Sequence, residues 1–597
     1  MKKKFTLLLF AILSLTMSLN AQSPLTFQWA HSVDGATTGG DNVMGMCKSS
    51  DGYYYVATNF GTSTTQNAMN VWFDGEQLKD KYGFYEGSPY TGTSQNGNML
   101  LQKIAKDGSV VWTTFTNKGD VDHSATQIAP TSDGGVIIAL KCRAWVEDAG
   151  LINLLCYVDP KGAEQRITSD QVKSEYRYLI MKITKAGKIG WYRIISGLVK
   201  TYDETHATKN NIYINGLAVD EKDNIYLAGN FRTEMYLNKA DGTSATLVAK
   251  SSIDSWGGDS QNVVGDMFLV KLDSKGYYLN SIVNDGIVDC AFLDKVAYND
   301  GKLYLDGRVR SVGNDITFGG VKVNASKDFQ TQLLLSVNTE DLSVNYIKSL
   351  TSVANKSGRF VIQNKSAQYL NGYVYFTGLL NGSWKQESES ENIVTNHDSK
   401  QLKGYVLKMN PETGKVEKAT VRTDGGIGGF FGVYEGAEKL YAFGYDFSGG
   451  AIVAPINKNT YAVETPIQVC DYGTVGNATA PIVDGENFIM ANRGGIARAT
   501  DNTVSFYGTD KKFENLNCWG SVYYSYKMSD VISTGINRPT ASGIDSDAFV
   551  DVYTIGGVKV KSGVAAGNAT EGLAKGIYIV NHKKVIVKKL LYNTLFK

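Results

Sequence analysis

A short polar turn followed by an apolar, aromatic run recurs along the chain, and each run stops near a small residue. Self-similarity on this scale indicates a repeat architecture, and a repeated strand-turn-strand unit is typical of a β-propeller. The pattern predicts an all-β protein with a seven-bladed β-propeller over residues 22–528. The seven copies of the turn are Asp51-Gly52, Asp133-Gly134, Asp223-Asn224, Asp300-Gly301, Asn371-Gly372, Glu435-Gly436 and Asp484-Gly485.

A second periodic motif fixes the order of the strands within a blade. It alternates apolar and polar positions, as in Leu269-Val270-Lys271-Leu272, and reads as a third strand. Aromatic residues such as Trp112 and Trp191 then open a fourth, outer strand. Trp29 has this outer-strand pattern but no blade before it, whereas the last blade ends on its third strand at Lys527-Met528. The N-terminal strand is therefore predicted to complete the last blade and close the ring, which pairs otherwise exposed edges.

The polar turns lie farther apart than the blades require. A four-stranded blade needs about 40–50 residues, and the excess is expected in long inter-strand loops, chiefly 59–98, 143–176 and 231–265. Loops of this length in a compact domain are usually functional or disordered. The sequence therefore favours these loops as the place of binding.

The segments GLAVDEKDNIYLAGNF (216–231) and GDMFLVKLDSKG (265–276) resemble the SBBP-type bacterial β-propeller repeat. In that repeat an Asp-aromatic-apolar-Val-Lys strand recurs around the ring with a strand pair of the Gly-Asn-x-Tyr-x-Ala-Gly type. The match is good in blades two to four and poor in blades six and seven. The resemblance implies a ring of blades and an extracytoplasmic setting, but no common reaction.

Composition agrees with many short strands and restricts the partners. The 597 residues are 43% hydrophobic and 11% aromatic, with 35 Tyr and 63 Gly against 9 Pro, as tight turns between strands require. Lys+Arg 60 against Asp+Glu 59 leaves a formal net charge of +1, so no overall field recruits nucleic acid or an anionic membrane. We expect no nucleic-acid partner and no cofactor.

The N-terminus has the pattern of a secretory signal peptide over residues 1–21. Three lysines precede an apolar stretch from Phe5 to Leu15, and a small-residue site ends at Ala21, after which cleavage is predicted. No later segment approaches the roughly 18 apolar residues that cross a bilayer. The mature protein is expected to be secreted or held at the outer cell surface, without a transmembrane segment.

The composition changes again beyond Met528. Residues 529–548 read as a linker, and residues 549–597 as a small β-sandwich-like domain. This domain resembles the C-terminal sorting domain of the Bacteroidetes type IX secretion system, which implies the outer-membrane secretion machinery as a partner. A plain β module that caps the propeller is the alternative. The residues that carry the resemblance include Tyr553, Gly557, Gly572, Lys575, Gly576, Tyr578 and Lys584.

Candidate binding residues lie in loops that lead into the innermost strands, where propellers bind ligands. Asp recurs there, either as a ring of carboxylates around a cation or sugar, or as turn residues that cap backbone amides. The non-repeating residues are His123, His206, Trp256 and Trp384, with both Trp in polar surroundings that predict exposed rings able to stack on sugars. Solvated loop histidines and ordinary surface aromatics are the alternative. The recurring carboxylates are Asp41, Asp122, Asp203, Asp289, Asp424 and Asp471.

Six cysteines in a chain of this length do not make a disulfide framework. Cys142 and Cys156 lie symmetrically about Ala149, as partners across a hairpin would, and Cys470 with Cys518 would bracket the last blade. Each pair is either a disulfide or two buried thiols. None has the CxxC spacing of a zinc or redox site, and no metal site is expected.

Dense catalytic motifs such as HExxH, GxSxG and the Walker loop do not occur in the sequence. The preferred interpretation is a noncatalytic, secreted or cell-surface protein that binds a glycan or protein partner. The alternative is a carbohydrate-active or peptide-cleaving enzyme at the channel mouth, with carboxylates contributed by separate blades.

Overall fold

The regular structure in the described residues consists of β-strands alone. The chain divides into two compact units, Met1–Asp530 and Val531–Lys597, which are treated separately. No helix in the described part of the chain is long and apolar enough to span a membrane. The computed structural model describes residues 25–35, 42–61, 71–77, 97–117, 121, 126–143, 145–146, 152–169, 176–197, 212–251, 265–354, 361–386, 393–396, 401–423, 428–446, 450–471, 479–493, 503–514, 520–529, 549–554, 559–565, 569–570, 573, 576–580 and 583–587.

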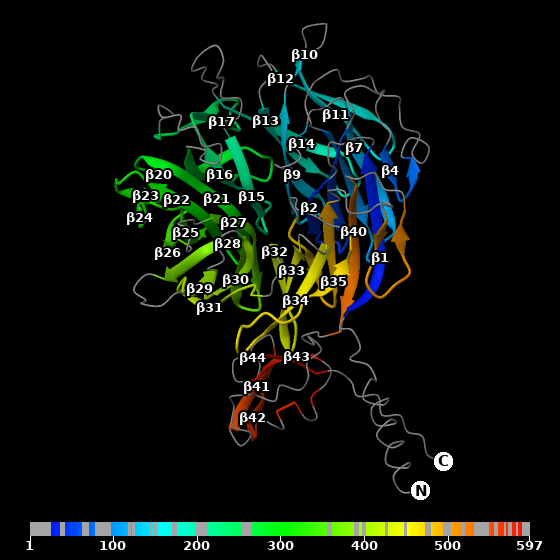
Figure 1. The fold of residues 1–597 in the computed structure, drawn as a ribbon, viewed down its shortest axis with the longest axis vertical. Helices are drawn as coiled ribbons and strands as arrows, with labels where there is room; N and C mark the ends of the chain where they lie inside the picture. The colour runs from blue at the N-terminus through cyan, green and yellow to red at the C-terminus, as the bar shows by residue number, and fades with distance from the viewer. Residues whose placement is uncertain are drawn as a thin grey trace. The chain divides into compact units, whose positions relative to one another are not determined.

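The first unit is a β-propeller built from antiparallel four-stranded meanders that follow one another along the chain (Figure 1). From β2 to β32, the first strand of each meander lies against the first strand of the next: β2 contacts β8, β8 contacts β15, β15 contacts β21, β21 contacts β27 and β27 contacts β32, while β36 contacts β2. These first strands are therefore innermost. Each meander is called a blade and takes the name of its innermost strand.

The strands of the earlier blades are β2 (Asn42–Lys48), β3 (Tyr54–Gly61), β6 (Gly97–Ile104) and β7 (Val110–Asn117); β8 (Gln127–Pro130), β9 (Val136–Arg143), β13 (Tyr176–Ile183) and β14 (Ile189–Gly197); β15 (Ile212–Val219), β16 (Ile225–Phe231), β19 (Asp266–Leu272) and β20 (Tyr278–Asp285). The strands of the later blades are β21 (Val288–Asn299), β22 (Lys302–Ser311), β25 (Thr331–Asn338) and β26 (Val344–Val353); β27 (Val361–Leu370), β28 (Tyr373–Gln386), β30 (Lys403–Met409) and β31 (Val416–Val421); β32 (Phe430–Glu435), β33 (Lys439–Asp446), β34 (Gly450–Asn457) and β35 (Ile467–Cys470); β36 (Ile482–Asp484), β37 (Asn487–Arg493), β40 (Ser521–Met528) and β1 (Leu25–Gly35).

Segments inserted between second and third strands form short strands that join the outer strand of the preceding blade. These pairings are β4 with β1, β11 with β7, β17 with β14, β23 with β20, and the end of β28 with β26, while Tyr507 and Ser505 bond to the backbone beside β35. The described parts of the three long loops that were expected to bind a ligand therefore connect neighbouring blades. The inserted strands are β4 (Val71–Phe73), β5 (Glu76–Gln77), β10 (Trp145–Val146), β11 (Ile152–Val158), β12 (Glu164–Ser169), β17 (Glu234–Asn238), β18 (Ser244–Val248), β23 (Ile316–Phe318), β24 (Val321–Val323), β29 (Val394–Asn396), β38 (Val504–Ser505) and β39 (Lys512–Phe513).

The ring closes by antiparallel pairing of the N-terminal strand β1 with β40, the third strand of the last blade. The register runs from Leu25 opposite Met528 to Val33 opposite Ser521. Figure 1 shows the two strands, blue and orange, side by side. The pairing predicted from the phase of Trp29 is therefore confirmed, since Thr26 lies opposite Lys527.

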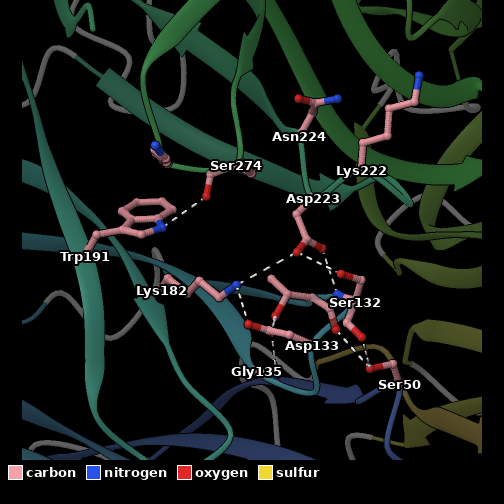
Figure 2. A network of polar contacts seen from close by, with 12 residues as sticks. Ser50, Ser132, Asp133, Gly135, Lys182, Trp191, Lys222, Asp223, Asn224 and Ser274 are labelled. Atoms are coloured by element: carbon pink, nitrogen blue, oxygen red, sulfur yellow. Dashed lines mark hydrogen bonds and ion pairs between the residues drawn. The ribbon is translucent and has the colours of Figure 1, made fainter.

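Tryptophans of three outer strands each donate a hydrogen bond to a turn of the next blade. The Trp29 indole Nε1 donates to the Lys106 carbonyl at 3.2 Å, Trp112 to Lys185 at 3.0 Å, and Trp191 to Ser274 at 3.1 Å (Figure 2). The turn glycine Gly108, with φ of 90°, lies under the Trp29 ring, where a Cβ would overlap it. The repeated aromatic and the repeated turn glycine thus form one packing unit.

The polar turns between first and second strands also link neighbouring blades (Figure 2). The Ser132 amide and hydroxyl donate to the Asp223 carboxylate at 2.7 and 2.9 Å, and the Lys182 ammonium lies 2.7 Å from the carboxylate of Asp133. Ser50 donates to the Ser132 carbonyl at 2.8 Å. The turn pattern that is most visible in the sequence therefore serves the scaffold.

The second unit is a four-stranded antiparallel sheet in its described residues, with the order β42-β41-β43-β44. The expected β-sandwich differs from this, because the described strands form one sheet. Tyr578 lies in its small apolar core, Tyr553 is in β41, Gly576 begins β43, and Lys584 pairs with Ile579. Gly557, Gly572 and Lys575 lie outside the described residues. The strands are β41 (Phe549–Thr554), β42 (Lys559–Ala565), β43 (Gly576–Val580) and β44 (Lys583–Val587).

A carboxylate at the closing blade collects contacts from the first blade. Asp484 lies 2.5 Å from the Lys48 ammonium and 3.2 Å from that of Lys106, and it accepts the Tyr54 hydroxyl at 2.9 Å. Burial alone would raise the pKa of Asp484, but the hydrogen bonds from Lys48, Tyr54 and Lys106 outweigh burial and lower it. The ionised carboxylate therefore stabilises the junction.

We expect Asp484→Asn to destabilise the propeller by about 2 kcal/mol at pH 7, as for other hydrogen bonds to charged groups. Because the folded-state pKa is lowered, the stabilisation is present above the unfolded pKa of about 4 and is lost as pH falls through the folded value. Thermal unfolding of both proteins at pH 7 and pH 3 measures this. The matched control is Asp315→Asn, which removes an exposed pair with Lys322; an equal effect of the control would contradict the assignment.

Candidate functional site

Innermost strands carry β-bulges at corresponding positions. In β15, Ile214 pairs with Gly229 and Gly216 pairs with Ala228, so Asn215 is the extra residue. A bulge takes its extra residue out of the ladder and re-aims the side chain. The extra residues are Met44 in β2, Asn215 in β15, Asp294 in β21, Lys365 in β27 and Phe431 in β32.

The small residue that ends each apolar run explains why the bulges form there. A Cβ on Gly229 would overlap the Tyr213 carbonyl oxygen, and the same holds for Gly307 against the Phe292 carbonyl. Gly378 and Gly444 face their bulged strands in the same way. Glycine is required at these four positions because the partner backbone approaches closely there. The repeat therefore places one re-aimed side chain in each of these blades.

The bulge residue of β21 is the centre of a buried polar network. Arg308 donates to both carboxylate oxygens of Asp294, from Nε at 2.7 Å and from a terminal nitrogen at 3.0 Å. The Asn364 amide of β27 donates to the same carboxylate at 2.9 Å. A two-pronged guanidinium pair of this kind is strong and fixed in geometry. Asp294 is thus fully engaged with neighbours from its own blade and the next.

The aromatic side chains of Tyr405 and Trp384 stabilise this network. The Tyr405 hydroxyl donates to the Asn364 amide oxygen at 2.6 Å, and the Trp384 ring packs edge-on against Tyr405 with centroids 4.9 Å apart. Trp384 is completely buried, so the prediction of an exposed, sugar-stacking ring is wrong. Its strand crosses to pair with β26 on one side and β29 on the other, which encloses the ring despite its polar sequence neighbours.

Asp306, on the strand next to Asp294, is a carboxyl group without a counter-ion of its own. One of its oxygens accepts the Lys295 backbone amide at 2.8 Å, and the other has no hydrogen-bond partner among the described residues. Burial, and then the charge of Asp294, raise the pKa of Asp306 well above its usual range. Burial beside Asp294 therefore disfavours the charged form of this carboxyl group.

Two lysines lie on the bulged strands beside this network and are half-buried. The Lys295 ammonium donates to the Asn215 carbonyl at 3.0 Å, and burial lowers its pKa. Lys365 lies 5.8 Å from the centroid of the Phe431 ring, and no hydrogen-bond acceptor for its ammonium occurs among the described residues. Burial, together with the charges of Lys295 and Arg308, lowers the pKa of Lys365 to about 8.

Lys295, Arg308 and Lys365 are called the cation cluster. Their three positive charges face two carboxyl groups, Asp294 and Asp306, and the raised pKa of Asp306 disfavours its charged form, so positive charge is in excess. The arrangement suits the binding of an anion. It does not suit paired carboxylate catalysis, since the Asp294 oxygens are taken by Arg308 and Asn364, and Asp306 is closed to solvent.

The site residues predicted from the loops lie elsewhere. His123, His206, Trp256, Asp122 and Asp203 fall outside the described residues. Two of the recurring loop carboxylates are described: Asp289 pairs with Arg310, and Asp471 accepts the Ser505 amide at 2.7 Å. Asp471 therefore fits the interpretation as a structural turn residue, whereas Asp289 lies within strand β21 and its carboxylate is paired with Arg310. No group of three or more His, Cys, Asp or Glu in the described ranges is placed to hold a metal ion.

The cysteine pair Cys142 and Cys156 does not span a hairpin. Cys142 is in β9 opposite Arg177, whereas Cys156 is in β11, which pairs with β7 of the preceding blade. Each is a buried thiol: Cys142 lies 3.9 Å from the Leu140 carbonyl and Cys156 lies 3.7 Å from the Glu164 carboxylate. The hairpin prediction is wrong because residues between them leave the blade to join β7. Cys470 is buried in β35, and Cys518 lies outside the described residues.

Fold and site together define a β-propeller with a positively charged cluster on its innermost strands. No protein-family model matches the chain, and no curated protein matches it. Among solved structures it is similar to quinohemoprotein alcohol dehydrogenase from Comamonas testosteroni, with 13% identity over 86% of this chain and 78% of that chain and a TM-score of 0.34. A europium-containing methanol dehydrogenase gives 10% identity over 85% and 94%, with a TM-score of 0.31.

The extracellular domains 1–2 of Drosophila Semaphorin 1a are another such structure, with 9% identity over 73% of this chain and 96% of that chain and a TM-score of 0.27. At TM-scores and identities this low, the likenesses carry no argument about what this chain binds or whether it catalyses a reaction. The site must be interpreted from its own residues.

The two carboxylates of the network are expected to respond oppositely to neutralisation. Asp294→Asn leaves the Arg308 guanidinium without its charge partner and should cost about 3–5 kcal/mol of unfolding free energy. Asp306→Asn should leave stability at pH 7 unchanged or higher. Because the pKa of Asp306 is raised in the folded state, the wild-type protein must keep a proton that the unfolded chain releases above about pH 4. The stability of Asp306→Asn relative to the wild type should therefore increase with pH.

Denaturant unfolding of the two variants between pH 4 and pH 8 tests this difference. A loss in Asp306→Asn as large as that in Asp294→Asn would show that Asp306 is ionised and paired, contrary to the structure. Since both substitutions replace a carboxylate by its amide, each serves as the size-matched control for the other.

Proposed function

We propose that this chain is an exported, seven-bladed β-propeller that binds a glycan or protein partner without transforming it. The observation that carries the proposal is the excess of positive charge in the cation cluster, on innermost strands where the repeat itself needs no charge. A group buried at a net cost in stability is a candidate for function. The blade count is supported by the seven polar turns, each of which precedes a second strand: β3, β9, β16, β22, β28, β33 and β37.

Export is supported by the two ends of the sequence. Residues 1–21 have the pattern of a signal peptide, and residues 549–597 resemble the type IX sorting domain. The SBBP-like repeats agree with an extracytoplasmic setting. The proposal therefore places the mature protein at the outer cell surface or outside the cell, with the secretion machinery as partner of its C-terminal domain.

The enzymatic alternative receives no support from the described residues. Asp294 and Asp306 are the two carboxyl groups beside the cation cluster, and neither presents a free ionised oxygen to a substrate. A glycosidase needs two carboxyl groups that face the bond to be cleaved. Binding is the function that the cation cluster supports.

Deletion of residues 549–597 tests the export proposal. If the C-terminal domain is an address for outer-membrane secretion, we expect the truncated chain to lose its signal peptide and remain in the periplasm, folded. Fractionation of producing cells, with limited proteolysis to confirm the fold, measures this. Secretion of the truncated protein at the level of the full chain would show that the domain is a structural cap.

Retention of ligands on the immobilised full-length protein tests the binding proposal. A panel of glycans and extracellular proteins is expected to contain ligands that the wild type retains and that Lys365→Met releases, because the substitution removes an ammonium for which the described part of the chain offers no hydrogen-bond acceptor. Lys322→Met, which removes an exposed and distant charge, is the matched control. A panel from which nothing is retained, or retention that is insensitive to Lys365, contradicts the proposal.

A further inference from the structure

We infer that the ligand of the cation cluster is an acidic polysaccharide, and that Lys295 and Lys365 together hold the carboxylate of one uronic-acid unit. This inference rests on the proposed function and names the class of ligand for the same site. Its basis is the set of donors that the internal network leaves unused.

The donors of the three cations are unequally occupied. The Arg308 guanidinium donates hydrogen bonds to Asp294, to the Ile362 carbonyl at 3.3 Å and to the Gln330 side chain at 3.5 Å. The Lys295 ammonium has one hydrogen bond within the described ranges, to the Asn215 carbonyl. Lys365 has none among the described residues. Two ammonium groups on adjacent bulged strands therefore offer several N–H donors, while Arg308 contributes charge without a free fork.

This occupancy leaves the two ammonium groups to meet the anion. The fork of a guanidinium pairs with carboxylates and phosphates alike, and the fork here is already filled by Asp294. Two compact ammonium groups match the two oxygens of a single carboxylate. An added carboxylate also offsets part of the excess positive charge of the cluster.

The surroundings favour a sugar acid over an acidic peptide. The Phe292 ring lies 4.6 Å from the Arg308 guanidinium and is half-buried, and Gln363, two residues before Lys365, is exposed. Aromatic faces and amides are the groups that bind sugar rings and hydroxyls. A uronate carries its carboxylate on a rigid ring, whereas an acidic side chain must lose the freedom of several bonds to deliver one.

Binding of an anion at this site should also be coupled to the protonation of Lys365. In the free protein Lys295, Arg308 and Asp294 face the Lys365 ammonium, and its pKa is about 8. A bound carboxylate favours the charged form, so it raises this pKa. Binding should therefore take up a proton between about pH 8 and pH 9, and affinity should fall as pH rises through that range.

The test compares three probes on the full-length protein by isothermal titration calorimetry: polygalacturonate, the same polymer after carboxyl reduction, and poly-L-glutamate. We expect polygalacturonate to bind at least about tenfold more tightly than either other probe at pH 7. In buffers of different ionisation enthalpy at pH 8.5, binding should show proton uptake. Lys365→Met should weaken polygalacturonate binding at least about tenfold, Lys365→Arg should restore most of it, and Lys322→Met should change nothing.

A purely structural role for Lys365 is separated by stability. Removing a buried ammonium without an acceptor should leave the melting temperature of Lys365→Met unchanged or higher. A lower melting temperature together with lost binding would overturn the inference, because the loss would then reflect damaged packing. Absence of proton uptake would also overturn the part assigned to Lys365.

The remaining outcomes distinguish the inference from the proposed function. Equal binding of the native and the carboxyl-reduced polymer, still sensitive to Lys365, would overturn the uronate inference and leave a binding function in place. Tighter binding of poly-L-glutamate would assign the site to acidic peptides. If polygalacturonate does not bind, the inference fails, and the glycan and protein panel decides whether the proposed function fails with it.

Discussion

Unpaired strand edges are the constraint on which this structure depends. A fan of separate sheets exposes its outer edges, and in this chain the first described strand, β1, pairs with the third strand of the last blade, β40. His31 of β1 adds to the closure, because its two ring nitrogens lie 2.7 Å from the Asp74 carboxylate and 2.8 Å from the Gly108 carbonyl. The same solution recurs where strands inserted in one blade extend the outer strand of the blade before it. The long insertions therefore pair with strand edges that would otherwise be exposed at the outside of the ring.

The innermost edge follows a different rule, and that rule places the candidate site. Bulged strands need a close partner backbone, so glycine recurs opposite them, and each bulge re-aims one side chain. The repeat fixes the position but not the residue. Met44 and Phe431 fill it with apolar side chains, Asn215 with an amide, and Asp294 and Lys365 with charges. Charge is therefore a property of particular blades and not of the ring.

Sequence patterns predicted the propeller fold and its closure because both depend on local signals. A polar turn with Gly, an alternating strand and an outer aromatic such as Trp29 each have a direct structural cause. The site was not predicted, because its residues are brought together by the pairing of β21 with β22 and by the contact of β21 with β27. Trp384 was misjudged because its polar neighbours in sequence say nothing of β26, which covers it. The available signal was a departure from the repeat: Arg308 and Lys365 stand where the SBBP-like blade has Asn230 and Asn215.

The energetics of the cation cluster explain why such a departure bears on function. Arg308 and Asp294 compensate each other, and the raised pKa of Asp306 shows that a second negative charge is disfavoured there. Lys365 has no such compensation, so a methionine of similar length would suit the folded state better than the lysine. Burial of an ammonium near two other cations opposes folding, as the lowered pKa of Lys365 records. Lys365 therefore lowers the stability of the free protein, and its presence is explained by the charge that it offers to an anionic ligand.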